Sequence, residues 1–205
     1  MTRLYITRHG ETKWNREKRF QGWKNSPLTE KGVLDGKKLN EIVKEKKIDK
    51  IYTSPLKRAY ETATYAKGDK DIDLIVLDEL REINMGSWEG RTIKDIKKVE
   101  SENYYNYWND PFKFIENSGE SFKSFLDRAE SALDIITNNS KKDENILVVT
   151  HGVTLKAIIS KITREDFLDY WRKPVLKQCS ISEIEIKDNK AHEIIRYGDV
   201  SHLID

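Results

Sequence analysis

Two of the four histidines stand in matching positions along the chain. The first is His9, between Arg8 and Gly10, and the second is His151, directly before Gly152. Each follows an apolar run that is typical of a buried strand, and ligands bind at the carboxyl ends of the strands in open α/β sheets. A lone histidine is more often structural than catalytic. Two in matched positions indicate that both belong to one site.

Two arginines indicate that this site binds an anion. Arg8 lies beside His9, and Arg58 follows the strand-like run 51–53, near the start of a predicted helix. A helix N-terminus favours anions, and a guanidinium offers paired donors that match phosphate oxygens. No histidine pair has the spacing of a metal site, and the G-x-S-x-G motif of serine hydrolases does not occur. The chemistry that remains is phosphoryl transfer to a histidine, which must be a neutral imidazole with one nitrogen free to attack.

Such a transfer needs a general acid that protonates the leaving oxygen. The best candidates lie in residues 79–90, which follow the predicted strand 74–77. Spacing alone leaves the choice among Glu79, Glu82 and Glu89 open, and the simplest alternative makes all three surface acids of a loop.

Apolar periodicity predicts the elements that would bring these residues together. The predicted strands are 3–7, 49–53, a short buried strand at 74–77, 146–150, and a hairpin of 180–186 and 192–197 with its turn at Asp188-Asn189. The predicted helices are 30–47 with Thr29 as N-cap, 56–66, 92–108, 122–136 and 153–162. This alternation indicates a mostly parallel α/β sheet with helices on both faces and antiparallel strands added towards the C-terminal end.

Length and composition narrow the class of protein. The 205 residues are predicted to form one domain, 1–205, since domains average about 150 residues. The net charge of +2 requires neither nucleic acid nor an anionic membrane as partner. A single cysteine, Cys179, excludes a disulfide scaffold and a cysteine zinc site. Arg3 and Arg8 precede any apolar core of a signal peptide, so we expect a cytoplasmic protein.

The candidate residues belong to a set of ordered motifs that resembles the histidine phosphatase superfamily, also called phosphoglycerate-mutase-like. The motifs extend from Leu4 to about Ile186, which is nearly the whole chain. One R-H-G tripeptide would say little, whereas several motifs in order are highly specific. The resemblance rests on Arg8-His9-Gly10-Glu11-Thr12 with Asn15, Gln21-Gly22-Trp23, Pro27-Leu28-Thr29 and Gly32; Ser54 to Arg58 with Ala59, Thr62 and Ala63; Leu80-Arg81-Glu82-Ile83 with Gly86 and Trp88-Glu89-Gly90; Gly119-Glu120-Ser121; and Val149-Thr150-His151-Gly152.

The resemblance implies a role for each matching position. His9 would be the phosphorylated nucleophile, and Glu82 would be the proton donor and later the base. The family's fold is a three-layer α/β/α sandwich, and the family needs no metal or other cofactor. The residues implied to bind substrate are Arg8, Arg58 and His151 on the transferred phosphoryl group, with Asn15 and the backbone of Gly152 as further ligands, and Gln21 and Gly22 beside the leaving group.

Within this family the sequence is more similar to the phosphatases than to the cofactor-dependent mutases. Residues 82–90 lack the E-R-x-Y-G pattern of the mutases, and no paired arginines follow to hold a second phosphate. We therefore expect a metal-independent phosphomonoesterase that acts through a phosphohistidine on a small phosphorylated metabolite. The alternatives are a phosphoglycerate mutase, an α-ribazole-phosphate phosphatase, a protein phosphatase, and a regulatory protein that binds a phosphorylated ligand without turnover. The sequence leaves the oligomeric state open, a homodimer included.

The segment at about 92–118 is expected to form a helical lid over the site. It is rich in aromatic side chains, for which two interpretations remain. They could be ordinary core packing of a helix, or they could line an apolar pocket for the leaving group. The residues concerned are Tyr104, Tyr105, Tyr107, Trp108, Phe112 and Phe114.

Overall fold

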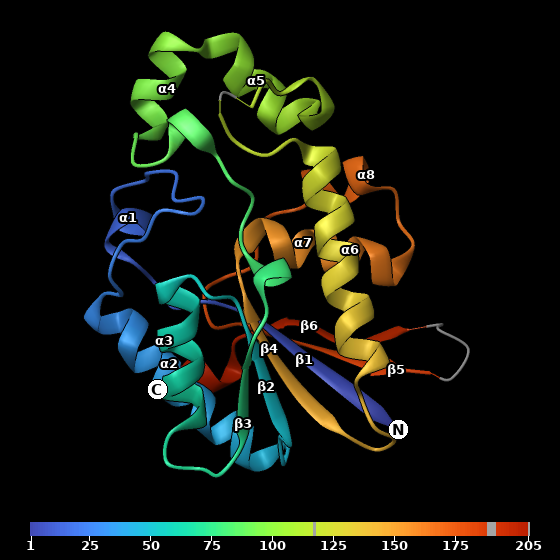
Figure 1. The fold of residues 1–205 in the computed structure, drawn as a ribbon. Helices are drawn as coiled ribbons and strands as arrows, with labels where there is room; N and C mark the ends of the chain where they lie inside the picture. Colours follow the sequence, from blue (N-terminus) through green and yellow to red (C-terminus); the bar gives the residue numbers. More distant parts are fainter. Residues whose placement is uncertain (117, 188–191, 205) are drawn as a thin grey trace.

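The computed structural model describes residues 1–116, 118–187 and 192–204. Strands and helices alternate along most of the chain (Figure 1). The strands are β1 (Thr2–Arg8), β2 (Lys50–Thr53), β3 (Asp73–Val76), β4 (Asn145–Thr150), β5 (Ile181–Ile186) and β6 (Glu193–Asp199). The helices are α1 (Lys13–Arg16), α2 (Glu30–Glu45), α3 (Lys57–Lys67), α4 (Ile93–Val99), α5 (Ser101–Asn109), α6 (Phe122–Asn138), α7 (Gly152–Thr163) and α8 (Phe167–Arg172).

Within the described residues the strands form one sheet in the order β3-β2-β4-β1-β5-β6. The first four of these strands pair in parallel, whereas β5 runs antiparallel to β1 and β6 runs antiparallel to β5. The predicted sheet type and its antiparallel addition are therefore confirmed. In the register of β1 and β4, Arg8 lies opposite Thr150. The two histidines that follow these residues must therefore be neighbours.

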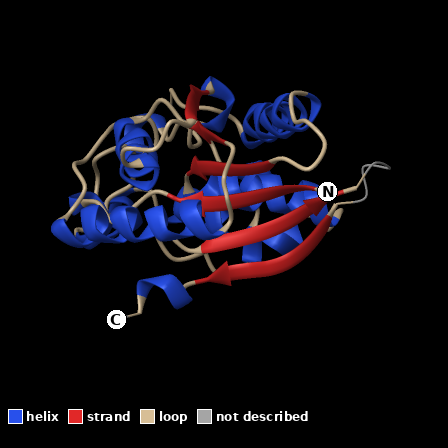
Figure 2. Ribbon diagram, turned by 90° about the horizontal axis from the view of Figure 1, so that it is seen from below, coloured by secondary structure: helices blue, strands red, loops and turns tan. Residues whose placement is uncertain are grey.

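The alternation of side chains along the central strands explains the helical layers. Leu4 and Ile6 of β1 belong to an apolar cluster with Phe125 of α6, and Tyr5 belongs to a second cluster with Leu39 of α2. Figure 1 shows α2 and α3 on one side of the sheet and α6 and α7 on the other. Figure 2 shows the strands from below, with helices packed around them. The structure is the predicted three-layer sandwich.

Two predicted elements differ from the structure. The strand predicted as buried at 74–77 is β3, which pairs only with β2 and lies at the sheet edge, where Asp73 and Val76 are exposed. The helix predicted at 92–108 is two helices, because the backbone breaks at Glu100. There the carboxylate accepts hydrogen bonds from Trp88 Nε1 and Arg91 and fixes the chain.

The remaining predicted boundaries agree with the structure to within a few residues. Thr29 is confirmed as the N-cap of α2, since its side chain accepts a hydrogen bond from the Gly32 N–H. The predicted turn at Asp188-Asn189 lies outside the described residues, and the returning strand begins at Glu193. None of the described helices is both long and apolar enough to cross a bilayer.

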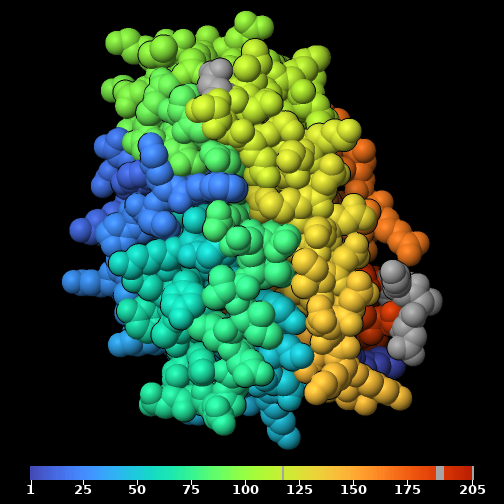
Figure 3. Space-filling model, in the orientation of Figure 1, coloured from blue at the N-terminus to red at the C-terminus, as the bar shows by residue number. Residues whose placement is uncertain are grey.

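The helices α4 and α5 lie at one end of the molecule, beyond the carboxyl ends of the strands (Figure 1). The space-filling view shows this segment, in green, covering that end (Figure 3). Trp88 connects it to the rest of the fold, because its buried ring contacts Phe20, Tyr107 and Phe114. Of these rings, Phe20 and Tyr107 also lie at the cavity beside His9.

Candidate active site

The two histidines meet where β1 and β4 end. The backbone N–H of His9 donates to the carbonyl of Thr150 at 2.9 Å, so the parallel pairing continues one residue past β1. The ring centroids of His9 and His151 are 5.2 Å apart, and both side chains are buried. The predicted convergence of the two strand ends is confirmed.

The hydrogen bonds of His9 define which nitrogen can attack. Its Nδ1 lies 2.7 Å from the carbonyl oxygen of Gly10, which can only accept, so Nδ1 carries the proton. Its Nε2 lies 3.2 Å from Nε of Arg58, which can only donate, so Nε2 holds a lone pair. Burial, with Arg58 and Arg8 nearby, holds the pKa of His9 well below its ordinary value of 6.5. His9 is therefore a neutral imidazole with Nε2 as the available nucleophile.

Arg58 is fixed in this site by the loop that follows α1. Its guanidinium donates to the carbonyl oxygens of Gly22 at 2.7 Å and Lys24 at 2.8 Å. Burial lowers its pKa to about 10, so the side chain remains charged at neutral pH. Gly22 has a φ of +51°, and a Cβ there would come within 2.0 Å of Glu89 Oε1. Glycine at this position lets the loop approach both side chains.

Two buried nitrogen atoms in the site have no hydrogen-bond partner among the described residues: Nε of Arg8 and Nδ1 of His151. The Arg8 guanidinium is held by the carbonyl of Leu176 at 3.2 Å, and His151 Nε2 lies 2.8 Å from the Ser54 hydroxyl. Burial, with Arg58 nearby, holds the pKa of His151 well below 6.5. Buried polar groups are almost always paired in folded proteins, so these atoms are candidates for binding a ligand.

Glu82 is held at the N-terminus of α7. Its carboxylate accepts hydrogen bonds from the backbone N–H groups of Val153 and Thr154, each at 3.1 Å, and from its neighbour Ile83 at 3.1 Å. The first N–H groups of a helix have no partner within the helix, so they are available to fix this side chain. The carboxylate thereby has a defined position beside the two histidines' strand ends.

The other two candidate acids have different surroundings. Glu89 accepts hydrogen bonds from the backbone N–H groups of Trp23, Lys24 and Met85, so it fixes loops. Glu79 lines a separate hollow with Trp23. Of the three glutamates, the structure brings only Glu82 to the cavity that His9 and Arg58 line.

A small cavity of about 130 Å³ brings most of the predicted residues together. Its predicted lining residues are Arg8, His9, Asn15, Gln21, Gly22, Arg58 and Glu82. His151 and Gly152 lie beside it: His151 contacts His9, and a Cβ on Gly152 would be 3.4 Å from Nε of Arg8. The backbone N–H of Thr12 donates to Asn15 Oδ1 at 3.0 Å, and the Thr12 hydroxyl donates to Gln21 Oε1 at 3.0 Å. The NH2 groups of the two amides are left as donors for a ligand.

The structure adds lining residues that the sequence did not single out. These are Arg19, Phe20, Ile83, Met85 and Val153. Of the aromatic residues in 104–114, only Tyr107 lines this cavity; Phe114 is buried in the core, and Tyr105 and Phe112 are exposed. Helical spacing can indicate that one side of such a segment faces the core. It does not indicate which of the aromatic side chains lines the cavity. The contact of Ser54 with His151 had an indication in the sequence, because Ser54 directly follows a predicted strand and therefore lies at a strand end.

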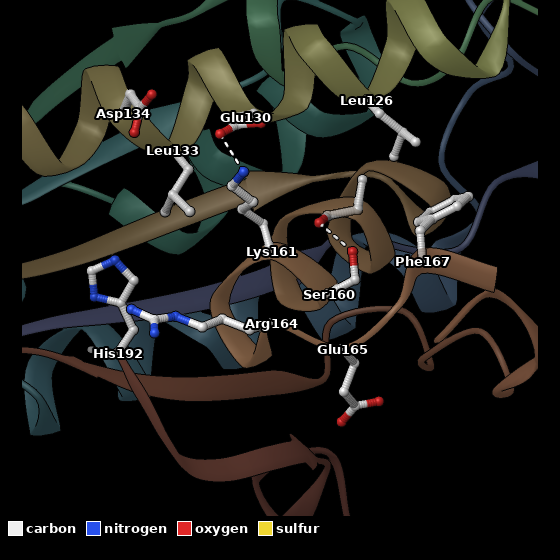
Figure 4. A pocket seen from close by; sticks show the side chains of 11 residues that line it. Leu126, Glu130, Leu133, Asp134, Ser160, Lys161, Arg164, Glu165, Phe167 and His192 are labelled. Carbon is white, nitrogen blue, oxygen red and sulfur yellow. Dashed lines mark hydrogen bonds and ion pairs between the residues drawn. The ribbon is translucent and has the colours of Figure 1, made fainter. Parts of the chain in front are cut away.

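A larger hollow of about 680 Å³ lies between α6 and α7, away from these residues (Figure 4). Lys161 and Glu130 form an ion pair across it, and Leu133 and Phe167 line it. None of the predicted catalytic side chains is part of its wall. The arrangement that can do chemistry is in the smaller cavity.

Two buried neutral histidines make the stability of the fold sensitive to acid. Below pH 6.5 the unfolded chain binds protons that folded His9 and His151 exclude, because both folded pKa values are lowered. The free energy of unfolding should therefore fall as the pH drops below 6.5, by up to about 1.4 kcal/mol per pH unit for each histidine. Urea denaturation between pH 7.5 and about pH 5 measures this slope. His151→Asn should make the dependence of the free energy of unfolding on pH shallower. An unchanged slope would contradict a lowered pKa of His151 in the folded protein.

No group of three or more His, Cys, Asp or Glu side chains within the described residues is arranged to hold a metal ion. The site brings together a neutral imidazole, two guanidinium groups, a second imidazole and a carboxylate. Donors of this kind suit the oxygens of a phosphoryl group, with the carboxylate placed for proton transfer.

Comparison with known proteins agrees with this geometry. Residues 4–199 match the family described as histidine phosphatase superfamily (branch 1). The structure is similar to that of YhfR from Bacillus stearothermophilus, with a TM-score of 0.93, 37% identity and 100% of both chains covered. It is similar to a phosphoserine phosphatase mutant from Entamoeba histolytica solved in complex with phosphoserine, with a TM-score of 0.83, 28% identity and 100% of both chains covered. The sequence is 32% identical to the "Probable phosphoglycerate mutase GpmB" of Escherichia coli O1:K1 / APEC, over 99% of this chain and 95% of that one. The chain belongs to the histidine phosphatase superfamily.

Proposed function

We propose that this chain is a phosphomonoesterase in which His9 accepts the phosphoryl group and water then releases it. The observation that carries this proposal is the protonation pattern of His9. Arg58 donates to Nε2, and the carbonyl of Gly10 accepts from Nδ1. The ring is therefore neutral, with its lone pair on Nε2, the atom that faces Arg58. Attack by Nε2 on phosphorus forms the N–P bond as the bond from phosphorus to the ester oxygen breaks.

The charge on the transferred group would be met by the donors around His9. Arg58 and Arg8 carry positive charge, and their guanidinium planes match pairs of phosphoryl oxygens. Arg8 Nε and His151 Nδ1 are the unpartnered buried nitrogens that such oxygens would contact, with Nδ1 as a donor when the Ser54 hydroxyl donates to Nε2. The NH2 group of Asn15 and the backbone of Gly152 complete the proposed set. Fixed donors of this kind lower the barrier because they need no reorganisation during the reaction.

Glu82 would act twice. In the first step it protonates the leaving oxygen, and in the second it accepts a proton from the water that attacks the phosphohistidine. Both steps require the carboxyl group to keep one position, which the N–H groups of Val153 and Thr154 provide. Gln21 and Gly22 lie on the same cavity wall, where the leaving group would sit.

A small phosphorylated metabolite is the proposed substrate. A cavity of about 130 Å³ suits a small ester, and a phosphorylated macromolecule would have to thread a small part of itself into it. The similarity to a phosphatase solved with phosphoserine supports a small polar ester. In this proposal residues 1–205 act as one domain and the helical segment at about 92–118 is the lid, whose Tyr107 lines the cavity. The similarity to a protein named as a mutase keeps phosphoglycerate mutase as the second candidate.

Phosphate release in EDTA distinguishes these candidates. The panel should contain phosphoserine, 3-phosphoglycerate, α-ribazole phosphate, sugar phosphates and 4-nitrophenyl phosphate. Hydrolysis without metal supports the phosphatase, and the preferred ester identifies the leaving group. Conversion of 3-phosphoglycerate to 2-phosphoglycerate in the presence of bisphosphoglycerate, without hydrolysis, would support the mutase. Binding of phosphorylated ligands with neither reaction would support a regulatory protein.

The Ser54 hydroxyl is expected to set the tautomer of His151. When the hydroxyl donates to Nε2, the proton sits on Nδ1 and faces the phosphoryl group. Ser54→Ala should therefore weaken competitive inhibition by inorganic phosphate about tenfold, which is the loss of one hydrogen bond worth ~1.4 kcal/mol. Ser160→Ala, which removes a buried hydroxyl elsewhere, is the matched control. Equal inhibition constants for Ser54→Ala and wild type would contradict this role.

A further inference from the structure

The segment that carries Glu82 depends on side chains for its backbone hydrogen bonds. Residues 79 and 80 end the short 3-10 turn Asp78–Leu80, and residues 81 and 82, which follow it, belong to no strand or helix. Buried carbonyl groups must nevertheless find donors. Arg128 of α6 contacts three of these four carbonyls: it donates to those of Glu79 and Arg81 at 2.8 Å and to that of Glu82 at 3.2 Å. Three further side chains add one donor each: Thr150 to Leu80 at 2.8 Å, Thr154 to Arg81 at 2.9 Å and Trp23 Nε1 to Glu82 at 2.8 Å.

Glu120 holds the other edge of the same guanidinium. Its Oε1 accepts from Nε of Arg128 at 2.8 Å, and its Oε2 accepts from a terminal nitrogen at 2.7 Å. Together with the three carbonyls this makes five contacts, which matches the five N–H donors of an arginine. The two side chains are only 18% and 12% exposed. Glu120 Oε2 also accepts from the N–H of Asn84, two residues after the acid.

We propose that the Arg128–Glu120 pair is the positioning device of the general acid Glu82. The inference rests on the proposed function, and it gives a role to the Gly119-Glu120-Ser121 motif, which that function leaves without one. Arg128 is a positioning residue because it does not line the catalytic cavity. It fixes the backbone of Glu82, while α7 fixes the carboxylate, so both ends of the side chain are held.

This arrangement predicts an effect that depends on the leaving group. An alkyl ester needs its departing oxygen protonated, whereas 4-nitrophenolate is a weak enough base to leave without a proton. A displaced acid should therefore slow phosphorylation by alkyl esters and leave that by the aryl ester nearly unchanged. The quantity that reports this step is kcat/KM.

The test uses Arg128→Lys, which keeps the charge but loses the planar fork. We expect kcat/KM for phosphoserine, or the best alkyl ester of the panel, to fall about tenfold or more, and that for 4-nitrophenyl phosphate to fall less than about threefold. Arg91→Lys is the matched control, since the Arg91 side chain pairs with partly buried Glu100 and, among the hydrogen bonds of the described residues, donates to none of the carbonyls of residues 79–82. In Arg91→Lys the ratio of kcat/KM for the alkyl ester to kcat/KM for 4-nitrophenyl phosphate should equal the wild-type ratio.

A double-mutant cycle separates positioning from a general structural effect. If Arg128 acts through the acid, Arg128→Lys should change kcat/KM less than about twofold when Glu82→Gln is already present. Equal losses for both esters, or equal losses with and without Glu82→Gln, would overturn the proposal. Glu120→Gln, which weakens the other edge of the pair, replaces Arg128→Lys in both measurements if that variant does not fold. Failure of the proposed function itself would look different, because wild-type hydrolysis would then not depend on His9.

Discussion

Replacing His9 with alanine is expected to lower kcat for every phosphate monoester by about 10⁴-fold or more, because no other group replaces the attacking nitrogen. The fold should persist, since the change removes a buried ring that contributes hydrogen bonds only to Gly10 and Arg58. Inorganic phosphate should still bind, because Arg8, Arg58 and His151 are unchanged. The measurement is phosphate release in EDTA, with phosphate binding followed by calorimetry.

His202→Ala is the control for this prediction. His202 is a half-buried histidine whose Nε2 bonds to the Cys179 carbonyl, and it takes no part in the cavity. Its replacement should leave kcat within about twofold of wild type. Retention of most activity by His9→Ala would mean that another group, or water directly, attacks phosphorus.

Replacing Glu82 with glutamine should give the second largest loss, and that loss should depend on the ester. The amide keeps an acceptor for the N–H groups of Val153 and Thr154 but cannot donate a carboxyl proton. For alkyl esters kcat/KM should fall about 10² to 10⁴-fold, the usual contribution of general acid catalysis. For 4-nitrophenyl phosphate it should fall much less, while kcat falls for both because release of phosphate from His9 needs the base.

Glu89→Gln is the informative comparison for the choice of acid. Glu89 fixes loops through the N–H groups of Trp23 and Lys24, so its replacement should affect alkyl and aryl esters alike. A loss of kcat/KM restricted to alkyl esters in Glu89→Gln, but not in Glu82→Gln, would show that Glu89 is the general acid and would contradict the choice of Glu82. Steady-state kinetics on the two esters with both variants decides this.

The sheet and most helices could be predicted because their patterns are local. Short continuous apolar runs mark β1 and β4, and Thr29 marks the start of α2. The position of β3 at the edge of the sheet could not be predicted, since a short apolar run does not show whether a second strand will pair with its other side. The break at Glu100 depends on Trp88 and Arg91, which come from outside the helix.

The meeting of His9 and His151 could be predicted from two strand ends in one parallel sheet. The identity of the acid could not be predicted from spacing, because it depends on which glutamate reaches the N-terminus of α7. The support from Arg128 was also beyond the sequence pattern. It comes from a helix 46 residues further along the chain, and only the folded structure shows what its guanidinium contacts.

Trapping the phosphorylated enzyme tests the central claim most directly. Wild type in EDTA is mixed with 4-nitrophenyl phosphate, quenched rapidly and digested without acid, and the peptides are measured by mass spectrometry. We predict one phosphoryl group on the peptide that contains His9, stable to base and lost in acid, and more of it in Glu82→Gln because its hydrolysis is slowed. Turnover without this phosphopeptide would contradict the mechanism. So would a phosphoryl group on another peptide at the same level in His9→Ala.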